Sequence, residues 1–325
     1  MPVRVKYPKG YNSRMLTKGR ITIKTFIITA GVALVLAGCG LGVNETATPH
    51  DLPTAAINPI ESPTPSASAT PTPLPVPAAA IVNGEVIPLS YFEHEVQRYK
   101  ASFTEGEPLP SDAEISEHVL NTLIEQQLLS QAARAAGFTF TDQMLEEKIT
   151  DLLAELGSGS ALTSWMQANF YDDAEFRMAL RLGSEAAWQR DQIIASVPDA
   201  VEQVRARQIF TRTAEEAQYA LASLNSGVSF DELAWRYSPE TGGELGWFPR
   251  GYLLFPAIEE AAFTLPVGLH SEIIQTEIGY HIIEVMEHAD AYPLTTDAKL
   301  SLQAKALTEW LQTKRAEAQI EITMP

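Results

Sequence analysis

The spacing of apolar residues changes along the body of the chain. Over residues 80–200 apolar positions recur every three or four residues, which predicts amphipathic helices. The clearest of them begins at Ser111, which forms a capping-box pattern with Glu114, and Gly137 ends it. Over residues 201–290 short apolar runs alternate with helical segments, which predicts a small α/β domain. Helical spacing returns near the C-terminus.

Further helices are predicted on both sides of a glycine-serine break at residues 157–160. Asp172 and Glu175 show a second capping-box pattern, and the helix that begins there should run to about residue 195. A last helix is predicted over residues 295–318. Its apolar side comprises Leu300, Ala304, Leu307, Trp310 and Leu311.

The α/β stretch predicts the element order β-α-α-β-α-β-β. Its helices should begin after Thr213 and Ser229, each of which has a glutamate three residues later, and at Pro256. Its strands are predicted at residues 204–210, 247–248, 271–275 and 280–287.

The N-terminal segment is first basic and then apolar. Residues 1–38 hold seven Lys or Arg and no Asp or Glu, and the apolar stretch from Thr25 to Gly38 has 14 residues. A helix that crosses a bilayer needs roughly 20 residues, so the segment predicts a secretory signal peptide. Translation from Met1 and translation from Met15 both fit this pattern.

The chain has one cysteine, directly after this segment. Leu36-Ala37-Gly38-Cys39 resembles the lipobox of bacterial lipoproteins, which implies that Cys39 is lipidated and becomes the mature N-terminus. The alternative is an uncleaved membrane anchor with a chance cysteine. Residues 44–79 contain nine prolines, which predicts an extended linker of roughly 100 Å at about 3.1 Å per residue.

The chain is strongly acidic. Its net charge is −18, and without residues 1–38 the 16 remaining basic side chains (23 − 7) stand against 41 acidic ones, a net charge of −25. Such a body repels nucleic acid, so no nucleic-acid partner is expected. The histidines show no metal-ligand spacing, and we expect neither a metal nor another cofactor.

Two segments of the α/β stretch form a recognisable pair, Gly242-Gly243-Glu244-Leu245-Gly246-Trp247-Phe248 and Ile278-Gly279-Tyr280-His281-Ile282-Ile283. The pair resembles the signature of parvulin-type (PpiC family) peptidyl-prolyl cis/trans isomerases, and the resemblance extends over residues 201–288. The opening Val82-Asn83-Gly84-Glu85-Val86-Ile87, which a helix follows, resembles the N-terminal chaperone module of SurA- and PrsA-like foldases.

These resemblances imply an α+β fold. A helical SurA/PrsA-like chaperone domain, made of an N-terminal module and a C-terminal helix, would carry an inserted parvulin domain of order β-α-α-β-α-β-β. Periodicity alone leaves a generic helical bundle open for the N-terminal module. The expected parts of the chain are a signal peptide (1–38), the lipidated Cys39 with a linker (39–79), the chaperone-like domain (80–200), the isomerase domain (201–290) and a C-terminal helix that packs on the chaperone-like domain (291–325).

Isomerisation of an X-Pro bond requires neither a nucleophile nor a metal. The barrier of about 18–20 kcal/mol reflects amide resonance, so a catalyst needs an apolar slot for the proline ring, exclusion of water and polar groups that favour the twisted amide. The resemblance implies residues for both tasks. The catalytic set comprises His281, Glu240, Thr276 and Gln208, and the substrate-binding set comprises Leu245, Ile258 and, as alternatives for one position, Leu253 and Leu254.

The chain departs from the family pattern at this site. Gln208 stands where the family has a histidine on its first strand, so it can bond to His281 but cannot titrate. Ile258 stands where many members have a phenylalanine, and the segment from Arg250 to Phe263 is one residue longer than in common members. For each candidate catalytic or substrate-binding side chain, the alternative interpretation is a purely structural role in the core or on the surface.

The sequence therefore predicts an extracytoplasmic foldase, anchored through Cys39 to the lipid bilayer of a bacterial cell membrane. It would isomerise X-Pro bonds in unfolded or partly folded exported polypeptides. Two alternatives are a holdase chaperone whose parvulin domain is a weak catalyst, and a structural lipoprotein without enzymatic activity.

Overall fold

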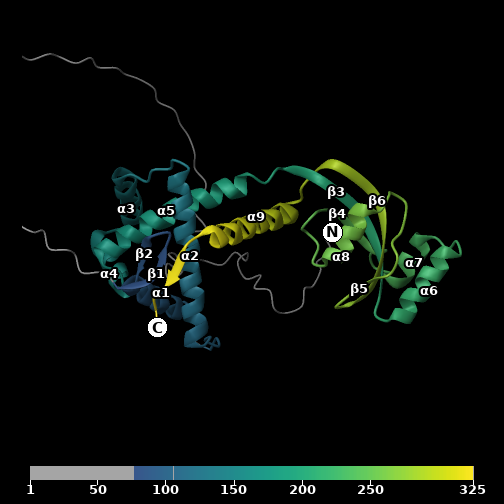
Figure 1. Ribbon diagram of the computed structural model, residues 1–325, viewed down its shortest axis with the longest axis horizontal. Coiled ribbons are helices and arrows are strands. Elements are labelled where there is room, and N and C mark those ends of the chain that lie inside the picture. Colours follow the sequence, from purple (N-terminus) through teal and green to yellow (C-terminus); the bar gives the residue numbers. More distant parts are fainter. Residues whose placement is uncertain (1–76, 105, 325) are drawn as a thin grey trace, which may run out of the picture.

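The computed structural model describes residues 77–104 and 106–324. The predicted signal peptide, Cys39 and the linker up to residue 76 lie outside the described residues. Figure 1 shows two bodies at opposite ends of the long axis, one mainly helical and one built around a sheet. The mixed fold predicted from the sequence is confirmed.

The helical body contains both ends of the described chain. Its elements are β1 (Ala78–Val82), β2 (Glu85–Pro88), α1 (Leu89–Ala101), α2 (Asp112–Ala135), α3 (Asp142–Leu156), α4 (Gly159–Ala168), α5 (Asp173–Ala195), α9 (Thr296–Glu317) and β7 (Ile320–Ile322). Val82, Ile115 and Ile124 are fully buried at the centre of its main core. Each such side chain contributes about 1.5–3 kcal/mol through burial.

Capping residues set the helix starts in this body. Ser111 forms the predicted capping box with Glu114 at the start of α2. At the start of α5, Asp172 accepts a hydrogen bond from the backbone N–H of Glu175. The carboxylate of Glu175 turns inward instead of closing the box, because the buried guanidinium of Arg98 donates to it at 3.1 Å. The second capping box is therefore only half formed.

The C-terminal helix returns to the helical body. Its second half, around Leu307 and Trp310, packs on α2 and α5. The predicted apolar side is wrong in its first half: Leu300 and Ala304 are exposed, because this half of α9 lies between the two bodies (Figure 1). After α9, strand β7 pairs antiparallel with β1, which the sequence did not predict. The sheet body is thus an insertion between α5 and α9.

The sheet body has the predicted element order. Its elements are β3 (Ala200–Thr211), α6 (Ala214–Asn225), α7 (Phe230–Tyr237), β4 (Glu244–Pro249), α8 (Pro256–Thr264), β5 (Ile274–Thr276) and β6 (Gly279–Pro293). The strands lie in the order β4-β3-β6-β5, and every neighbouring pair is antiparallel.

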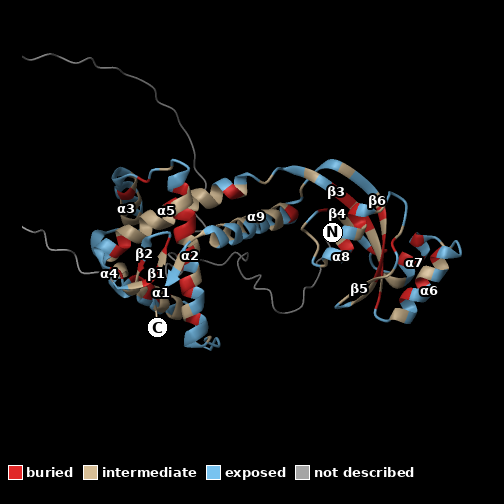
Figure 2. Ribbon diagram, in the orientation of Figure 1, coloured by how far each residue is buried: buried red, intermediate tan, exposed pale blue. Residues whose placement is uncertain are grey.

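Helices cover both faces of this sheet. α8 packs on one face, around Ile258 and Ile283, and α6 and α7 pack on the other, around Ile209 and Ile282. Side chains alternate between the faces along a strand, so His281 shares the α8 face with Ile283. Figure 2 shows the buried residues that follow β3 and β6 through the middle of this body.

Strands β3 and β6 are longer than predicted. They continue past the other strands as a two-stranded ribbon, in which Ala200 lies opposite Pro293. Where the ribbon begins, opposite Pro249 at the end of β4, the side chain of Gln203 is fully buried, and its NH2 group donates to the carbonyl oxygen of Tyr292 at 2.6 Å. The ribbon joins the sheet body to the helical body (Figure 1).

Candidate active site

Three polar side chains from three neighbouring strands meet on the α8 face of the sheet. His281 lies on β6, between Gln208 on β3 and Thr276 on β5. Its Nδ1 is 2.8 Å from Oε1 of Gln208, and its Nε2 is 2.9 Å from Oγ1 of Thr276. The strand order β3-β6-β5 brings together residues that are 73 and 5 positions apart in the chain.

The partners of the imidazole define its protonation. The amide oxygen of Gln208 can only accept, so Nδ1 of His281 carries the hydrogen and donates it. Nε2 then accepts from the hydroxyl of Thr276. The imidazole is 2% exposed, and this burial lowers the pKa of His281 below its usual value because the charged ring would lose its hydration. The ring is therefore neutral at neutral pH.

Two aromatic rings border the imidazole. The ring centroids of Phe210 and Phe255 lie 5.0 Å and 6.1 Å from that of His281. Sequence reasoning did not select either ring. The available signals were the strand register, which places Phe210 opposite His281, and the position of Phe255 directly before Pro256.

An apolar wall lies beside this group. Leu245 and Leu253 are half-buried, and with Phe255 they pack on the core around Ile258, which is 5% exposed. Leu254 is 73% exposed and takes no part in this packing. Of the two alternatives for the same position, the structure therefore brings Leu253 to the wall. The role of these residues in binding proline stays a prediction.

Glu240 lies on the loop between α7 and β4. It is exposed and, with Ser238, Pro239 and Thr241, lines an open depression of about 300 Å³. Within the described residues it shares no hydrogen bond with His281 or its partners. The structure therefore brings three of the four predicted catalytic side chains together and leaves Glu240 outside this group.

Gly243, on the same loop, connects the loop backbone to strand β3 by a hydrogen bond. The backbone oxygen of Gly243 accepts from the N–H of Gln208 at 2.8 Å, and Gly243 has a φ of +71°. A Cβ at this position would collide with the carbonyl oxygen of Gln208. Gly243 of the sequence motif is thus explained by close approach of the loop backbone to β3, whereas a Cβ at Gly242 would meet the side chain of Trp235 on α7.

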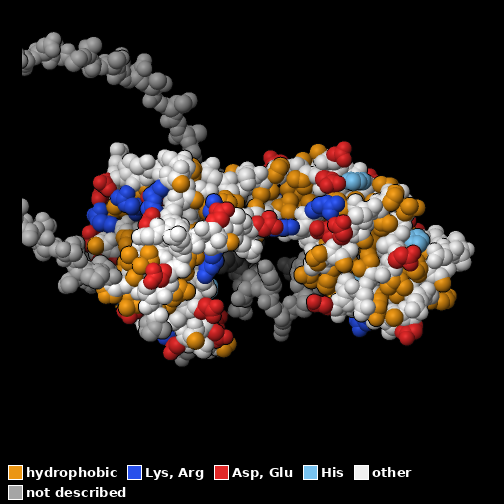
Figure 3. All heavy atoms as spheres, in the orientation of Figure 1, with side chains coloured by type: hydrophobic (Ala, Val, Ile, Leu, Met, Phe, Trp, Pro, Cys, Tyr) orange, Lys and Arg blue, Asp and Glu red, His pale blue; other side chains and the backbone are white. Residues whose placement is uncertain are grey.

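Hydrophobic side chains gather on the surface of the sheet body, as Figure 3 shows. The exposed ones include Leu254, Val267, Leu269 and Ile278, each more than half exposed. In the described part of the chain, no three His, Cys, Asp or Glu side chains are grouped to bind a metal. No helix among residues 77–104 and 106–324 is long and apolar enough to span a bilayer.

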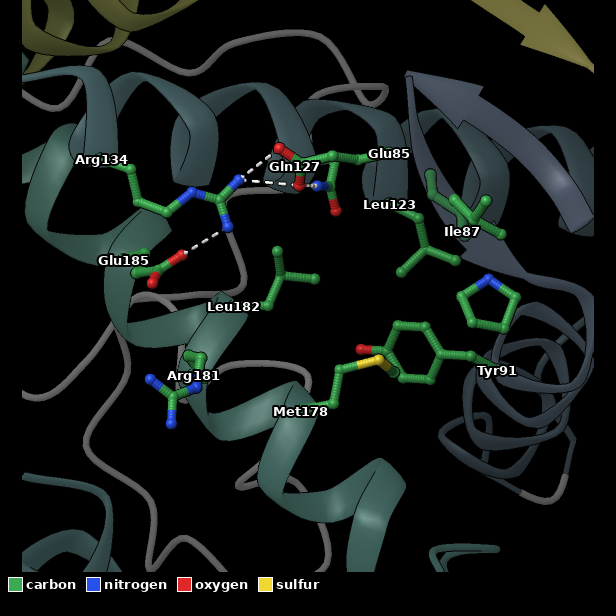
Figure 4. A pocket seen from close by; sticks show the side chains of 12 residues that line it. Glu85, Ile87, Tyr91, Leu123, Gln127, Arg134, Met178, Arg181, Leu182 and Glu185 are labelled. Atoms are coloured by element: carbon green, nitrogen blue, oxygen red, sulfur yellow. Dashed lines mark hydrogen bonds and ion pairs between the residues drawn. The ribbon is translucent and has the colours of Figure 1, made fainter. Parts of the chain in front are cut away.

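The helical body has a pocket of its own, shown in Figure 4, with a volume of about 170 Å³. Tyr91, Leu123 and Met178 form part of its apolar wall. On its polar side the carboxylate of Glu85 accepts hydrogen bonds from Arg134, at 2.7 Å, and from Gln127, at 2.6 Å. β2, which forms one side of this pocket, is an edge strand of the sheet β2-β1-β7.

Comparisons with known proteins match both bodies. The family model of the SurA-like N-terminal domain matches residues 74–176, and the model of the PPIC-type PPIASE domain (Rotamase) matches residues 193–287. The peptidyl-prolyl cis-trans isomerase PIN4 of Gibberella zeae is 34% identical over 110 residues, which are 32% of this chain and 82% of that protein. This chain belongs to the family of PPIC-type peptidyl-prolyl isomerases.

Other relatives of this PPIC-type isomerase are foldases. The foldase protein PrsA of Caldanaerobacter subterraneus subsp. tengcongensis is 27% identical over 243 residues, 63% of this chain and 72% of that protein. Among solved structures, the peptidylprolyl isomerase PrsA of Bacillus anthracis is similar with a TM-score of 0.39 and 23% identity, over 61% of this chain and 96% of that one. The predicted resemblance to parvulin-type isomerases and PrsA/SurA-like foldases, and the predicted enzyme class, are confirmed.

Proposed function

We propose that this PPIC-type isomerase acts outside the cytoplasm on exported polypeptides and is held at a membrane by lipid on Cys39. The observation that carries the catalytic part is the buried His281, held by two hydrogen bonds beside an apolar wall. The location rests on the sequence: the pattern of a signal peptide, the lipobox-like segment and a long proline-rich linker.

The proposed reaction has no covalent step. The proline ring binds against Leu245 and Leu253, where burial removes water that would stabilise the planar amide. Because His281 holds the oxygen of Gln208, the NH2 group of Gln208 is left to donate to the amide nitrogen, which becomes an acceptor only when the amide twists. A donor that binds the twisted state better than the planar state lowers the barrier. In this proposal the exposed loop of Glu240 brings its carboxylate beside the substrate amide when the polypeptide binds.

A proline-peptide isomerisation assay tests the catalytic part. We expect His281→Ala to lower kcat/KM by about tenfold or more, since it removes the group that orients Gln208 and Thr276. The matched control is His288→Ala, because His288 lies on the same strand but is exposed, in a hydrogen bond with Glu202. Equal rates for wild type and His281→Ala, or a wild-type rate equal to that of the peptide in buffer, would contradict the proposal.

Isolation of the N-terminal peptide from the membrane fraction tests the anchor separately. We expect a peptide that begins at Cys39 and carries acyl chains. More than one chain is expected, because a single chain binds a bilayer only marginally. An unmodified Cys39 thiol, or a peptide that begins upstream of it, would overturn the lipid anchor and leave the isomerase site untouched.

The pocket of the helical body favours a second function, the holding of unfolded polypeptides. A volume of about 170 Å³ suits one apolar side chain, because an apolar cavity of about 150 Å³ binds benzene. We expect Leu182→Glu, a change in the pocket wall, to weaken suppression of client aggregation and to leave isomerase activity unchanged. Leu300→Glu, at an exposed leucine of α9, is the control. Unchanged suppression in Leu182→Glu would count against this function.

A further inference from the structure

One carboxylate holds the loop between β4 and α8. The backbone N–H of Gly251 donates to Oε1 of Glu259 at 2.6 Å, and the N–H groups of Tyr252 and Leu253 donate to Oε2 at 3.0 Å and 3.1 Å. Glu259 lies in the first turn of α8. Three successive N–H groups that converge on an anion form a concave binding arrangement, and hydrogen bonds to a charged acceptor are the stronger kind.

This loop connects the end of β4 to the start of α8. It has no regular secondary structure, and it turns at Gly251 with a φ of +82°. The side chain of Lys305, from α9, lies over this glycine, so that a Cβ there would collide with it. The same loop places Leu253 half-buried on the apolar wall and leaves Leu254 73% exposed. The three bonds to Glu259 therefore hold the backbone at Leu253, on which the positions of both leucines depend.

We propose that Glu259 is a positioning residue for the isomerase reaction: it fixes the loop backbone so that Leu253 forms one side of the proline slot. This inference rests on the proposed function, because it takes Leu253 to contact the proline ring. Glu259 itself contacts no substrate and acts only through the loop.

The test compares Glu259→Gln with Glu260→Gln in the full chain. A glutamine at position 259 keeps the size of the side chain but puts an NH2 donor where backbone N–H groups need an acceptor. We expect KM for a proline peptide to rise about fivefold or more with kcat nearly unchanged, because the contact of Leu253 with the proline ring is the same in the planar and the twisted amide, while Leu245 still excludes water. Glu260 is the neighbouring exposed glutamate, paired with Arg250, and its variant should behave like wild type.

A double-mutant cycle with Leu253→Ala separates positioning from a general effect on the fold. If Glu259 acts through Leu253, Glu259→Gln should add little to the KM of Leu253→Ala. Fully additive effects, or a normal KM in Glu259→Gln, would overturn the inference. So would a variant that is unfolded at the assay temperature, because Glu259 would then support the whole domain. If Leu253→Ala alone leaves KM unchanged, the proposed slot has failed rather than the bonding of the loop by Glu259.

Amide hydrogen exchange of the wild-type chain gives an independent measurement. The amides of Gly251, Tyr252 and Leu253 should be protected although they lie in a loop, and Glu259→Gln should release all three while the strands of the sheet keep their protection. Exchange at the rate of free loop amides in the wild type would overturn the inference.

Discussion

At the scale of single residues, burial and hydrogen bonding fix His281 in one state. Its pKa is lowered by burial, its Nδ1 donates to Gln208, and its Nε2 accepts from Thr276. A histidine in place of Gln208 would itself titrate, but a glutamine does not. With glutamine at position 208, His281 is the one titratable ring of this group. Its charge state is set by its burial and its two hydrogen bonds.

We expect isomerase activity to be independent of pH above about pH 6.5, the ordinary pKa of histidine, and to fall only at lower pH. The reason is that the folded chain keeps the His281 ring neutral down to its lowered pKa. The measurement is kcat/KM between about pH 5 and pH 9. A loss of activity centred at or above about pH 6.5 would contradict the neutral ring.

The same shift makes folding stability depend on pH. The unfolded chain protonates His281 at a higher pH than the folded chain does, so this contribution to stability is complete above about pH 6.5 and is lost as the pH falls toward the lowered pKa. Urea unfolding at about pH 5 and about pH 7.5 measures the loss. In His281→Gln this part of the pH dependence should disappear; its persistence would assign the effect to other groups.

Thr276→Val tests the hydroxyl that donates to Nε2. Valine keeps the shape but leaves the ring nitrogen without its donor, so we expect about 1 kcal/mol less stability and a kcat/KM about five- to tenfold lower. Thr308→Val is the control, because the hydroxyl of Thr308 bonds only within its own helix, to the carbonyl oxygen of Ala304. Equal effects of the two variants would remove Thr276 from the site.

At the scale of elements, the position of the Glu240 loop depends on Gly243. We expect Gly243→Ala to cost clearly more than Gly227→Ala, about 3 kcal/mol or more against about 1–2 kcal/mol. Both glycines have positive φ, but a Cβ at Gly243 meets the backbone of Gln208 and one at Gly227 meets nothing within 4 Å. Chemical denaturation measures both. Similar costs would mean that the loop can move away from β3 without loss.

The helix starts could be predicted from the sequence because caps are local: Ser111, Thr213 and Ser229 each accept from an N–H three residues on. β7 could not, since it has three residues and its partner β1 lies about 240 positions earlier. Among the site residues, the family resemblance indicated His281 and its two partners, Gln208 and Thr276. It could not indicate which of the two alternatives, Leu253 or Leu254, packs on the apolar wall, because that depends on the conformation of a loop whose backbone bonds to the carboxylate of Glu259.

At the scale of the whole molecule, the chain builds two bodies with separate cores. The clusters of the helical body contain residues before 200 and after 295, and those of the sheet body contain residues between these limits. The insertion topology therefore makes the helical body depend on pairing between the two ends of the described chain. The sheet body, in contrast, forms its sheet and both of its core clusters from residues of the inserted segment alone.

Removal of residues 319–325 should therefore separate the stabilities of the two bodies. It deletes β7 and, with it, the bonds of Asn83 to Gln319, where the backbone N–H of Asn83 donates at 2.8 Å and its side-chain oxygen accepts at 2.9 Å. We expect the helical body to unfold at lower denaturant concentration, while the isomerase rate at 25 °C stays within about twofold of wild type, since no side chain of the site is touched.

The measurements are a denaturation curve followed by circular dichroism and the peptide assay at each denaturant concentration. The control is Thr313→Val, which leaves β7 in place and alters a hydroxyl that bonds within α9. Loss of activity and helical signal in a single transition, whose midpoint is shifted by the deletion, would contradict the prediction, because the sheet body would then unfold together with the helical body.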